Sequence, residues 1–396
     1  MNGLHVGLDR DGLRLVNAAE ALVPLLSEHA MDVDRSGHVP PEVFKHVVGA
    51  GLLRVCVPKR FGGEQQKTQT LLAISAALGR GCGSTAWIAQ NISATAILVG
   101  MFCEEAQRDV WEGTPDIGIC ASQSPPKSMT RVDNGYRISG RWSYLSGVEQ
   151  AGWALLMIPI ADGPAREIAF ALLPVTAGTV EHTWNVVGMR GTASNTLVLK
   201  DYVVPNHRVL SLTKALAGTY ATEYPGETLY RTPIAPSLAL GLLGAPIGMA
   251  QGALEHVLGF ADKRSIAYST FPSQSASTGF QIQVAEASLK IDTARLFAAQ
   301  LARELDDAAK RGVLLEPTDS TRIRAAVGFA CQQLREASQI LANAHGTATF
   351  AEFNPLQRMW RDLNTATSHG MLTPMLGYEV YGKSLVGSKE TVAPLV

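Results

Sequence analysis

The pattern of apolar residues in this chain changes twice along its 396 residues, and this order limits the folds it can adopt. Up to about Gly113, apolar residues recur with a helical period, as at Leu22, Val23, Leu25 and Leu26. From about residue 114 to 210, short stretches rich in β-branched and aromatic residues alternate with turn signals. Long amphipathic helical patterns return after about residue 235. Helices, then strands, then helices predict an α+β fold rather than alternating β-α-β units.

We expect three domains from this order. They are an N-terminal all-helical domain over residues 1–113, a middle β-barrel or β-sandwich domain over 114–212, and a C-terminal four-helix bundle over 213–396. In the middle region, Asp133-Asn134-Gly135 is a strong turn signal between two strands.

One uncharged segment, residues 232–254, is apolar enough to suggest a membrane span. Its prolines and glycines and its Gln251 favour a buried core helix instead. Four glycines recur at spacings of three, four and four, which places them near one helix face where another backbone can approach closely. They are Gly241, Gly244, Gly248 and Gly252.

Charge and cysteine content exclude several classes of protein. Lys plus Arg is 34 and Asp plus Glu is 35, so no basic excess is available to bind a nucleic acid backbone. The five cysteines are widely spaced and form no CxxC pair, which indicates reduced thiols in the cytoplasm. Asp9, Arg10 and Asp11 interrupt the stretch where a signal peptide needs an apolar run.

Several catalytic and cofactor motifs are missing from the sequence. None of the nine histidines forms HExxH, and no Glu-x-x-His pair suggests a di-iron bundle, so we expect no metal. There is no GxSxG nucleophile motif. The glycines of GLLGAPIG follow no strand, so they are not a dinucleotide fingerprint. These absences leave two possibilities: an enzyme that uses an organic cofactor, or a protein that is not an enzyme.

Two segments place polar residues in apolar surroundings. Ser139–Gly147, SGRWSYLSG, is either an edge strand with a turn or the wall of a flat ligand's site, with Trp142 packing and Ser146 hydrogen bonding. In Trp184–Thr196, WNVVGMRGTASNT, backbone N–H groups of a Gly/Ser/Thr loop could hold phosphate or carbonyl oxygens.

The stretch WNVVGMRGTASNTLVLKDYVVPNHRVLS resembles the middle-domain signature of the acyl-CoA dehydrogenase superfamily. GSTAWIA, GYRISGRWSYLSG and PLQRMWRD resemble one branch of it, the oxygenase components of two-component flavin monooxygenases such as p-hydroxyphenylacetate hydroxylase. The resemblance covers about residues 35–390. It implies the acyl-CoA dehydrogenase-like fold, a homotetramer, and reaction of O2 with reduced FMN or FAD that a separate flavin reductase supplies.

The parent dehydrogenases use a glutamate base, usually eight residues after the Arg-Asp of the last long helix. Here Gly370 stands at that distance from Asp362, and Glu255 lies too far along its helix to match the alternative place. A desaturase without a carboxylate base cannot start its reaction. The resemblance instead makes His369 and Ser146 the catalytic residues. Ser146 would hold the N5 hydrogen of a C4a-hydroperoxyflavin, and His369 would control proton supply.

The remaining site residues follow from the resemblance alone. The cofactor-binding residues it implies are Trp142, Ser146, Arg190, Thr192, Ser194 and Arg264, and the substrate pocket it implies holds Trp87, Thr95 and Ser122. Arg190 is equally compatible with a structural ion pair, and Arg264 with a solvated helix end. Phenol hydroxylases of this branch usually carry a histidine at the position of Thr95. The resemblance therefore does not specify a phenol, and we expect a small apolar or aromatic metabolite as the substrate. Two alternatives stay open: an acyl-CoA dehydrogenase with a displaced base, and a non-catalytic flavin-fold binding protein.

Overall fold

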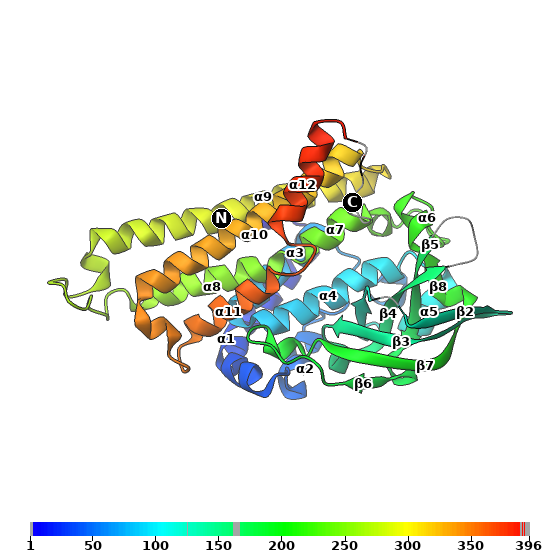
Figure 1. Ribbon diagram of the computed structural model, residues 1–396, viewed down its shortest axis with the longest axis horizontal. Coiled ribbons are helices and arrows are strands. Elements are labelled where there is room, and N and C mark those ends of the chain that lie inside the picture. The colour runs from blue at the N-terminus through cyan, green and yellow to red at the C-terminus, as the bar shows by residue number, and fades with distance from the viewer. Residues whose placement is uncertain (1–2, 125, 161–166, 389, 391, 393–396) are drawn as a thin grey trace.

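The structure is a computed structural model that describes residues 3–124, 126–160, 167–388, 390 and 392. It is elongated, with long helices at one end and β-strands at the other (Figure 1). The order of helices, strands and helices confirms the predicted α+β fold. The domain limits after residues 113 and 212 stay predictions. They fall between the helix that ends at Trp111 and the strand that begins at Gly118, and beside the strand that ends at Ser211.

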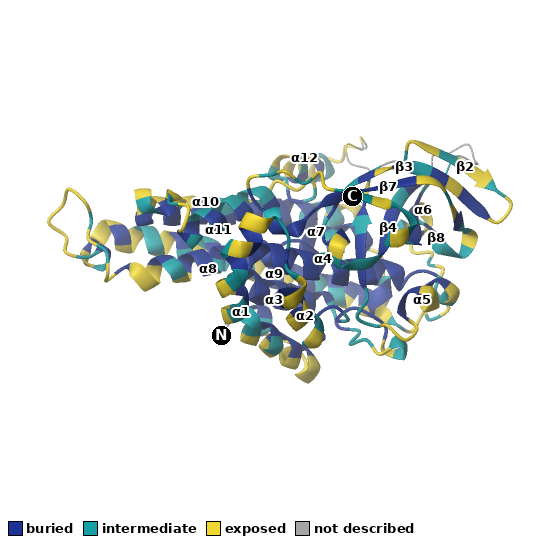
Figure 2. Cartoon of the chain, turned by 90° about the horizontal axis from the view of Figure 1, so that it is seen from below, coloured by how far each residue is buried: buried dark blue, intermediate teal, exposed yellow. Residues whose placement is uncertain are grey.

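The N-terminal helices form the centre of the molecule. They are α1 (Arg10–Ser36), α2 (Pro41–Gly49), α3 (Thr68–Gly81), α4 (Gly83–Val99) and α5 (Glu104–Trp111). Pro41 opens α2 at a position where its missing N–H removes no helical hydrogen bond. Helices α3 and α4 are apolar all round, and nearly every residue in them is buried (Figure 2).

The middle region forms two four-stranded sheets with strand orders β1-β4-β5-β8 and β2-β3-β7-β6. Their strands are β1 (Gly118–Ser122), β2 (Ser128–Val132), β3 (Gly135–Leu145), β4 (Ala151–Ile160), β5 (Glu167–Pro174), β6 (Thr179–Glu181), β7 (Asn195–Pro205) and β8 (Val209–Ser211). Asp133 and Asn134 connect β2 to β3 in an antiparallel hairpin, which confirms the predicted turn. Side chains of both sheets share one apolar core, which includes Ile138, Trp142 and Leu156.

The C-terminal region is helical, as predicted. After the short α6 (Leu212–Leu216), its helices are α7 (Ile234–Gly241), α8 (Gly244–Phe260), α9 (Thr278–Arg311), α10 (Pro317–His345), α11 (Pro355–Ala366) and α12 (Pro374–Leu385). The buried core helix expected over residues 232–254 is present but not continuous, because a turn at Leu242 and Leu243 separates α7 from α8. Pro246 explains the break, since its ring would clash with the carbonyl of Leu242 if the helix continued.

Helices α7 and α8 together, Ile234–Phe260, are long and apolar enough to cross a membrane by length and composition alone. In the fold, 89% of their most apolar window is buried inside the protein, so they are core helices. The predicted close approach occurs against α3, where a Cβ atom at Gly248 would lie 2.2 Å from the Ala76 carbonyl oxygen. Gly244 and Gly252 also face α3, but Gly241 faces open space.

Candidate active site

Three segments that are distant in the sequence meet beside Trp87 of α4. The indole N–H of Trp87 donates a hydrogen bond to Ser146 Oγ, 3.1 Å away, in the turn that follows β3. The other side of the indole faces His369, in the turn between α11 and α12, with ring centroids 5.9 Å apart. The structure thus brings together both predicted catalytic residues around one predicted pocket residue.

Ser146 begins a chain of three hydroxyl groups that runs into the protein. Its Oγ lies 2.8 Å from Ser194 Oγ, which lies 2.7 Å from Thr192 Oγ1, and Thr192 donates to the Met189 carbonyl at 2.9 Å. Ser194 and Thr192 are buried, whereas Ser146 is only half-buried. Ser146 is therefore the least buried of the three hydroxyl groups.

His369 is held in a tight turn by hydrogen bonds to its ring and to the following backbone. Its Nδ1 accepts the N–H of Met371 at 3.2 Å, and the buried Arg324 of α10 donates to the Gly370 carbonyl at 2.6 Å. Desolvation by the surrounding protein is the larger cause that lowers the pKa of His369, to about 4, and the positive charge of Arg324 adds to it. Part of the residue is nevertheless exposed to solvent. The imidazole is therefore neutral at pH 7, and its one proton is on Nε2.

The aromatic residue that borders the site is Tyr144 rather than the predicted Trp142. Trp142 is fully buried between the two sheets, and its indole N–H donates to the Met157 carbonyl at 3.2 Å. An irregularity in the β3–β7 register follows it, and Tyr144 adopts φ 63°, so its side chain turns outward and is 70% exposed. The ring of Tyr144 contacts the half-buried Trp184 edge-on, with 6.0 Å between centroids.

Sequence reasoning missed Tyr144 and Trp184, although both lie in the two segments it singled out. The signal was ambiguous, because regular strand alternation gives Trp142, Tyr144 and Ser146 the same face. Only the local bulge separates them. Asn91 was also missed. It lies one helical turn from Trp87 and from Thr95 on α4, is half-buried, and donates to the Trp87 carbonyl at 2.7 Å.

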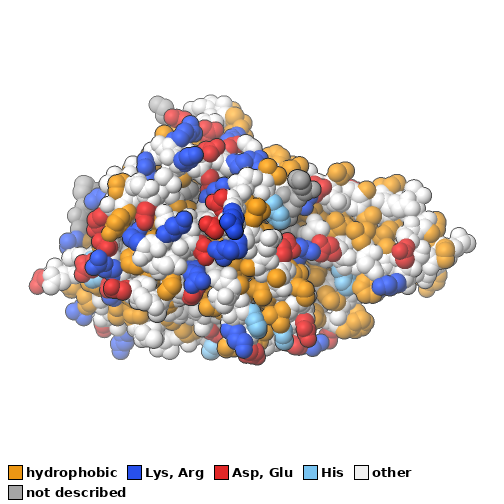
Figure 3. Space-filling view, turned by 180° about the vertical axis from the view of Figure 1, so that it is seen from behind, with side chains coloured by type: hydrophobic (Ala, Val, Ile, Leu, Met, Phe, Trp, Pro, Cys, Tyr) orange, Lys and Arg blue, Asp and Glu red, His pale blue; other side chains and the backbone are white. Residues whose placement is uncertain are grey.

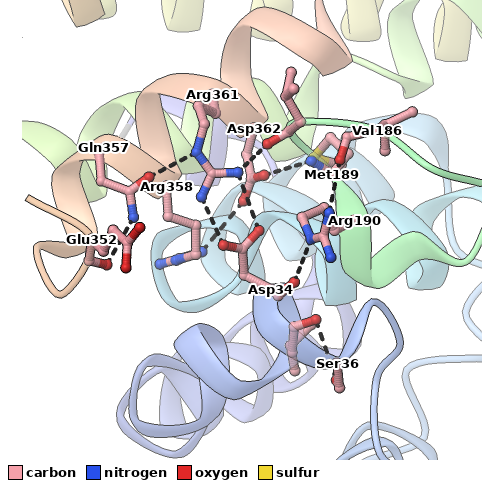
Figure 4. Close-up of polar contacts among 12 residues, drawn as sticks. Asp34, Ser36, Val186, Met189, Arg190, Glu352, Gln357, Arg358, Arg361 and Asp362 are labelled. Atoms are coloured by element: carbon pink, nitrogen blue, oxygen red, sulfur yellow. Dashed lines mark hydrogen bonds and ion pairs between the residues drawn. The ribbon is translucent and has the colours of Figure 1, made fainter. Parts of the chain in front are cut away.

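A buried ionic network ties the helix before His369 to the loop before Ser194. Arg358 and Asp362 of α11 form an ion pair at 3.5 Å with both side chains 3% exposed, and Asp362 accepts the Met189 N–H at 2.5 Å. Figure 4 shows Arg361 of the same helix pointing toward Asp34 of α1, which it pairs with at 2.7 Å. Burial raises the pKa of Asp362, and the charge of Arg358 opposes that shift.

Arg190, predicted as a cofactor-binding residue, binds backbone carbonyl groups of the protein itself. Its guanidinium donates to the carbonyls of Asp34 at 2.7 Å and Val186 at 3.1 Å (Figure 4). We therefore leave Arg190, like Trp142, out of the proposed flavin contacts.

Two predicted pocket residues are buried and hydrogen bonded to nearby backbone. Ser122 donates to the Ser143 carbonyl at 2.7 Å, and Thr95 donates to the Asn91 carbonyl at 2.8 Å. Residues beside Thr95 on α4 line a small apolar cavity against α3 and α7, with hydroxyl groups at its edge. Its lining is Thr68, Leu71, Ala94, Ile97, Leu98, Met101, Thr232, Ile234, Ser237 and Leu238.

Arg264 lies in the segment after α8, and that end of α8 points away from the β-strands (Figure 1). It donates to the His345 carbonyl at 3.3 Å, and its buried Nε has no hydrogen-bond partner among the residues that the structure describes. His345 contacts Asn354 at the start of α11, whereas His369 follows its end. Because α11 has 12 residues, about 18 Å of helix separates the two places.

The helical region, paired β-sheets and C-terminal bundle define the acyl-CoA dehydrogenase class of fold. The acyl-CoA dehydrogenase N-terminal domain matches residues 17–112, and the C-terminal domain matches residues 240–374. The chain is 33% identical to the FADH2-dependent resorcinol hydroxylase oxygenase component of Rhizobium sp., over 95% of this chain and 94% of that protein.

It is 31% identical to the flavin-dependent monooxygenase oxygenase subunit HsaA of Rhodococcus jostii, over 93% of this chain and 97% of that one. The structure of XiaF from Streptomyces sp., solved with FADH2 and glycerol, superposes with a TM-score of 0.90 at 33% identity, covering 96% of this chain and 97% of XiaF. The chain belongs to the flavin-dependent monooxygenases of the acyl-CoA dehydrogenase fold, as an oxygenase component.

Proposed function

We propose that this protein is the oxygenase component of a two-component system that inserts one atom of O2 into a small aromatic metabolite. The observation that carries the proposal is the contact of Ser146, Trp87 and His369. A hydroxyl and a neutral imidazole flank one indole here, where the parent dehydrogenases need a carboxylate base. Gly370, at the position of that base, has no side chain.

The cofactor is a reduced flavin, FMN or FAD, which a separate flavin reductase supplies. The residues present fit its ring system, because Tyr144, two residues before the half-buried Ser146, forms an aromatic pair with Trp184. When bound, the flavin supplies the two electrons that activate O2. The protein's part is to orient the ring, to exclude water and to hold protons in place.

Each residue of the cluster has one role in this account. Ser146 Oγ accepts a hydrogen bond from the flavin, and Trp87 holds Ser146 through its indole N–H. His369 cannot act as a base through Nε2, because that nitrogen carries the ring proton at pH 7. It offers a hydrogen bond from Nε2 instead, while Nδ1 is held by the Met371 N–H.

The substrate binds along α4, next to Trp87. Asn91, with Thr95 one turn further on, places an amide on this helix face, and the neighbouring cavity lining is mostly apolar. Such surroundings favour an aromatic ring that carries one polar group. Three relatives are named for resorcinol, p-hydroxyphenylacetate and indole-3-acetate as substrates, which agrees with this class.

The functional protein is a homotetramer in which Arg264 reaches the flavin of a neighbouring subunit. Arg264 is too far from Ser146 of its own chain, and a planar guanidinium with a free Nε suits a phosphate group. Helix α9 offers a surface for assembly, because Ile282, Leu289 and Leu296 recur every seven residues and are 60–67% exposed. Figure 3 shows hydrophobic side chains gathered on this bundle half of the molecule, opposite a more charged half.

This assembly is tested by the mass in solution. Light scattering should give four chains for the wild type and a smaller species for Leu289→Asp, which places a charge in the α9 stripe. A monomeric wild type with full flavin affinity would overturn the assembly and the role of Arg264. The five free cysteines, four of them buried, agree with a cytoplasmic location.

The dehydrogenase alternative has little support in the geometry. Glu255 of α8, the acid nearest to the alternative base position, is paired with Arg80 at 3.2 Å. Turnover with a flavin reductase, NADH and a set of phenols tests the proposal, with hydroxylated product and hydrogen peroxide both measured. Product formation with phenols supports it. Oxidation of acyl-CoA thioesters without oxygenation of any phenol would favour the dehydrogenase, and neither activity would favour a binding protein.

A further inference from the structure

We propose that Thr192 and Ser194 are positioning residues that fix the direction of the Ser146 O–H bond and thereby make the site prefer reduced over oxidised flavin. The inference rests on the proposed function, because it needs a flavin beside Ser146. It assigns to the two buried hydroxyls a role that requires no contact with the cofactor.

The inner end of the hydroxyl chain is fixed by the Met189 carbonyl. This oxygen accepts hydrogen bonds from Thr192 Oγ1 at 2.9 Å, from the Trp184 indole N–H at 2.9 Å and from the Thr192 N–H at 3.2 Å. The Met189 N–H is itself held by Asp362, and the residue adopts φ 56°. A carbonyl can only accept, so the Thr192 proton points toward Met189.

The outer end is fixed by Trp87, because an indole N–H can only donate. Between these ends, Ser146, Ser194 and Thr192 have one proton each. A single arrangement gives every contact its proton: Trp87 donates to Ser146, Ser146 to Ser194, Ser194 to Thr192, and Thr192 to the Met189 carbonyl.

The Ser146 proton is therefore directed inward, which leaves one lone pair of Ser146 Oγ free to accept a hydrogen bond from a ligand. Reduced flavin carries a hydrogen on N5 and can donate to this lone pair, whereas oxidised flavin presents a lone pair at N5 and meets repulsion. One neutral hydrogen bond changes an affinity by about threefold to tenfold. A selectivity of at least that size follows for reduced flavin.

The test is a pair of anaerobic titrations of the purified full chain with oxidised FMN and with photoreduced FMN, which give two dissociation constants. Thr192→Val keeps the shape but removes the terminal hydroxyl. Ser194 then turns its proton to Ser146, and Ser146 points its own proton outward. We expect the ratio of the oxidised to the reduced dissociation constant to fall by about threefold to tenfold. Thr192→Ser restores the hydroxyl and should restore the ratio.

Ser194→Ala is a second variant with the same expected direction, since it also frees the Ser146 proton. Circular dichroism establishes that each variant is folded. A merely structural role would weaken both redox states alike and leave the ratio unchanged, which overturns the inference. If the wild type binds neither FMN nor FAD in either redox state, the proposed function itself fails. Wild-type binding with an unchanged ratio in both variants refutes only the role of the hydroxyl chain.

Discussion

The imidazole of His369 lies edge-on to the indole of Trp87, with 5.9 Å between the ring centroids and 62° between the ring planes. The same indole donates to Ser146, so one side chain connects the two groups that we assign to oxygen chemistry. Trp87 is buried within α4, among the most buried helices of the fold. Ser146 and His369 both lie in turns, and each of them contacts this one buried side chain.

Replacing Ser146 with alanine should uncouple the reaction. The variant loses the oxygen that accepts from the flavin, so the fraction of O2 that appears in product should fall about tenfold while hydrogen peroxide rises. Both quantities are measured in the same reductase-coupled assay. Ser139→Ala, in the preceding strand β3 and bonded to Asp201 at the surface, is the control and should stay coupled. Equal coupling in Ser146→Ala and wild type would contradict the role of Ser146.

The imidazole of His369 should titrate near pH 4 rather than near 6.5. The unfolded chain binds a proton at His369 near pH 6.5, whereas the folded protein does so only near pH 4. Lowering the pH from about 6.5 toward 4 therefore favours the unfolded state and reduces the stability of the folded protein. NMR titration of the imidazole signal, assigned by its absence in His369→Gln, measures the midpoint. Arg324→Met removes a neighbouring positive charge and should raise it. A wild-type midpoint near 6.5 would contradict the neutral donor role.

Gly248→Ala should destabilise the protein by about 1–3 kcal/mol. A Cβ atom there would lie 2.2 Å from the Ala76 carbonyl, so α8 must move away from α3. Gly241→Ala is the matched control, because nothing lies within 4 Å of its added Cβ. Urea unfolding of both variants gives the difference. Equal free energies of unfolding would show that the two helices are not in close contact.

Asp362→Ala should cost about 3–5 kcal/mol of stability, because it leaves the buried Arg358 charge without its partner and frees the Met189 N–H. The double variant Arg358→Met with Asp362→Leu removes both charges and should recover part of this loss. Thermal unfolding followed by circular dichroism measures each. A single variant as stable as wild type would show that the ion pair is not buried in solution.

Hydrophobic periodicity in the sequence predicted the layer order, and the family resemblance singled out Ser146, His369 and Trp87, which the structure brings into contact through Trp87. The sequence did not predict that Tyr144, rather than Trp142, borders the site. This difference depends on one bulge and one left-handed residue inside a regular strand. Sequence reasoning likewise missed the break before α8, although Pro246 carried the signal. The hydrogen bonds of Arg190 required knowledge of how α1 packs, which no spacing in the sequence contains.

The most direct measurement is a single turnover in which the protein, loaded anaerobically with photoreduced FMN or FAD, is mixed with 18O2 and resorcinol or a related phenol. Mass spectrometry of the product then counts labelled oxygen atoms. The account predicts one 18O atom per product molecule, less product with Ser146→Ala, and none without the protein. Unlabelled phenol with all of the O2 recovered as hydrogen peroxide, for every phenol and both flavins, would contradict it.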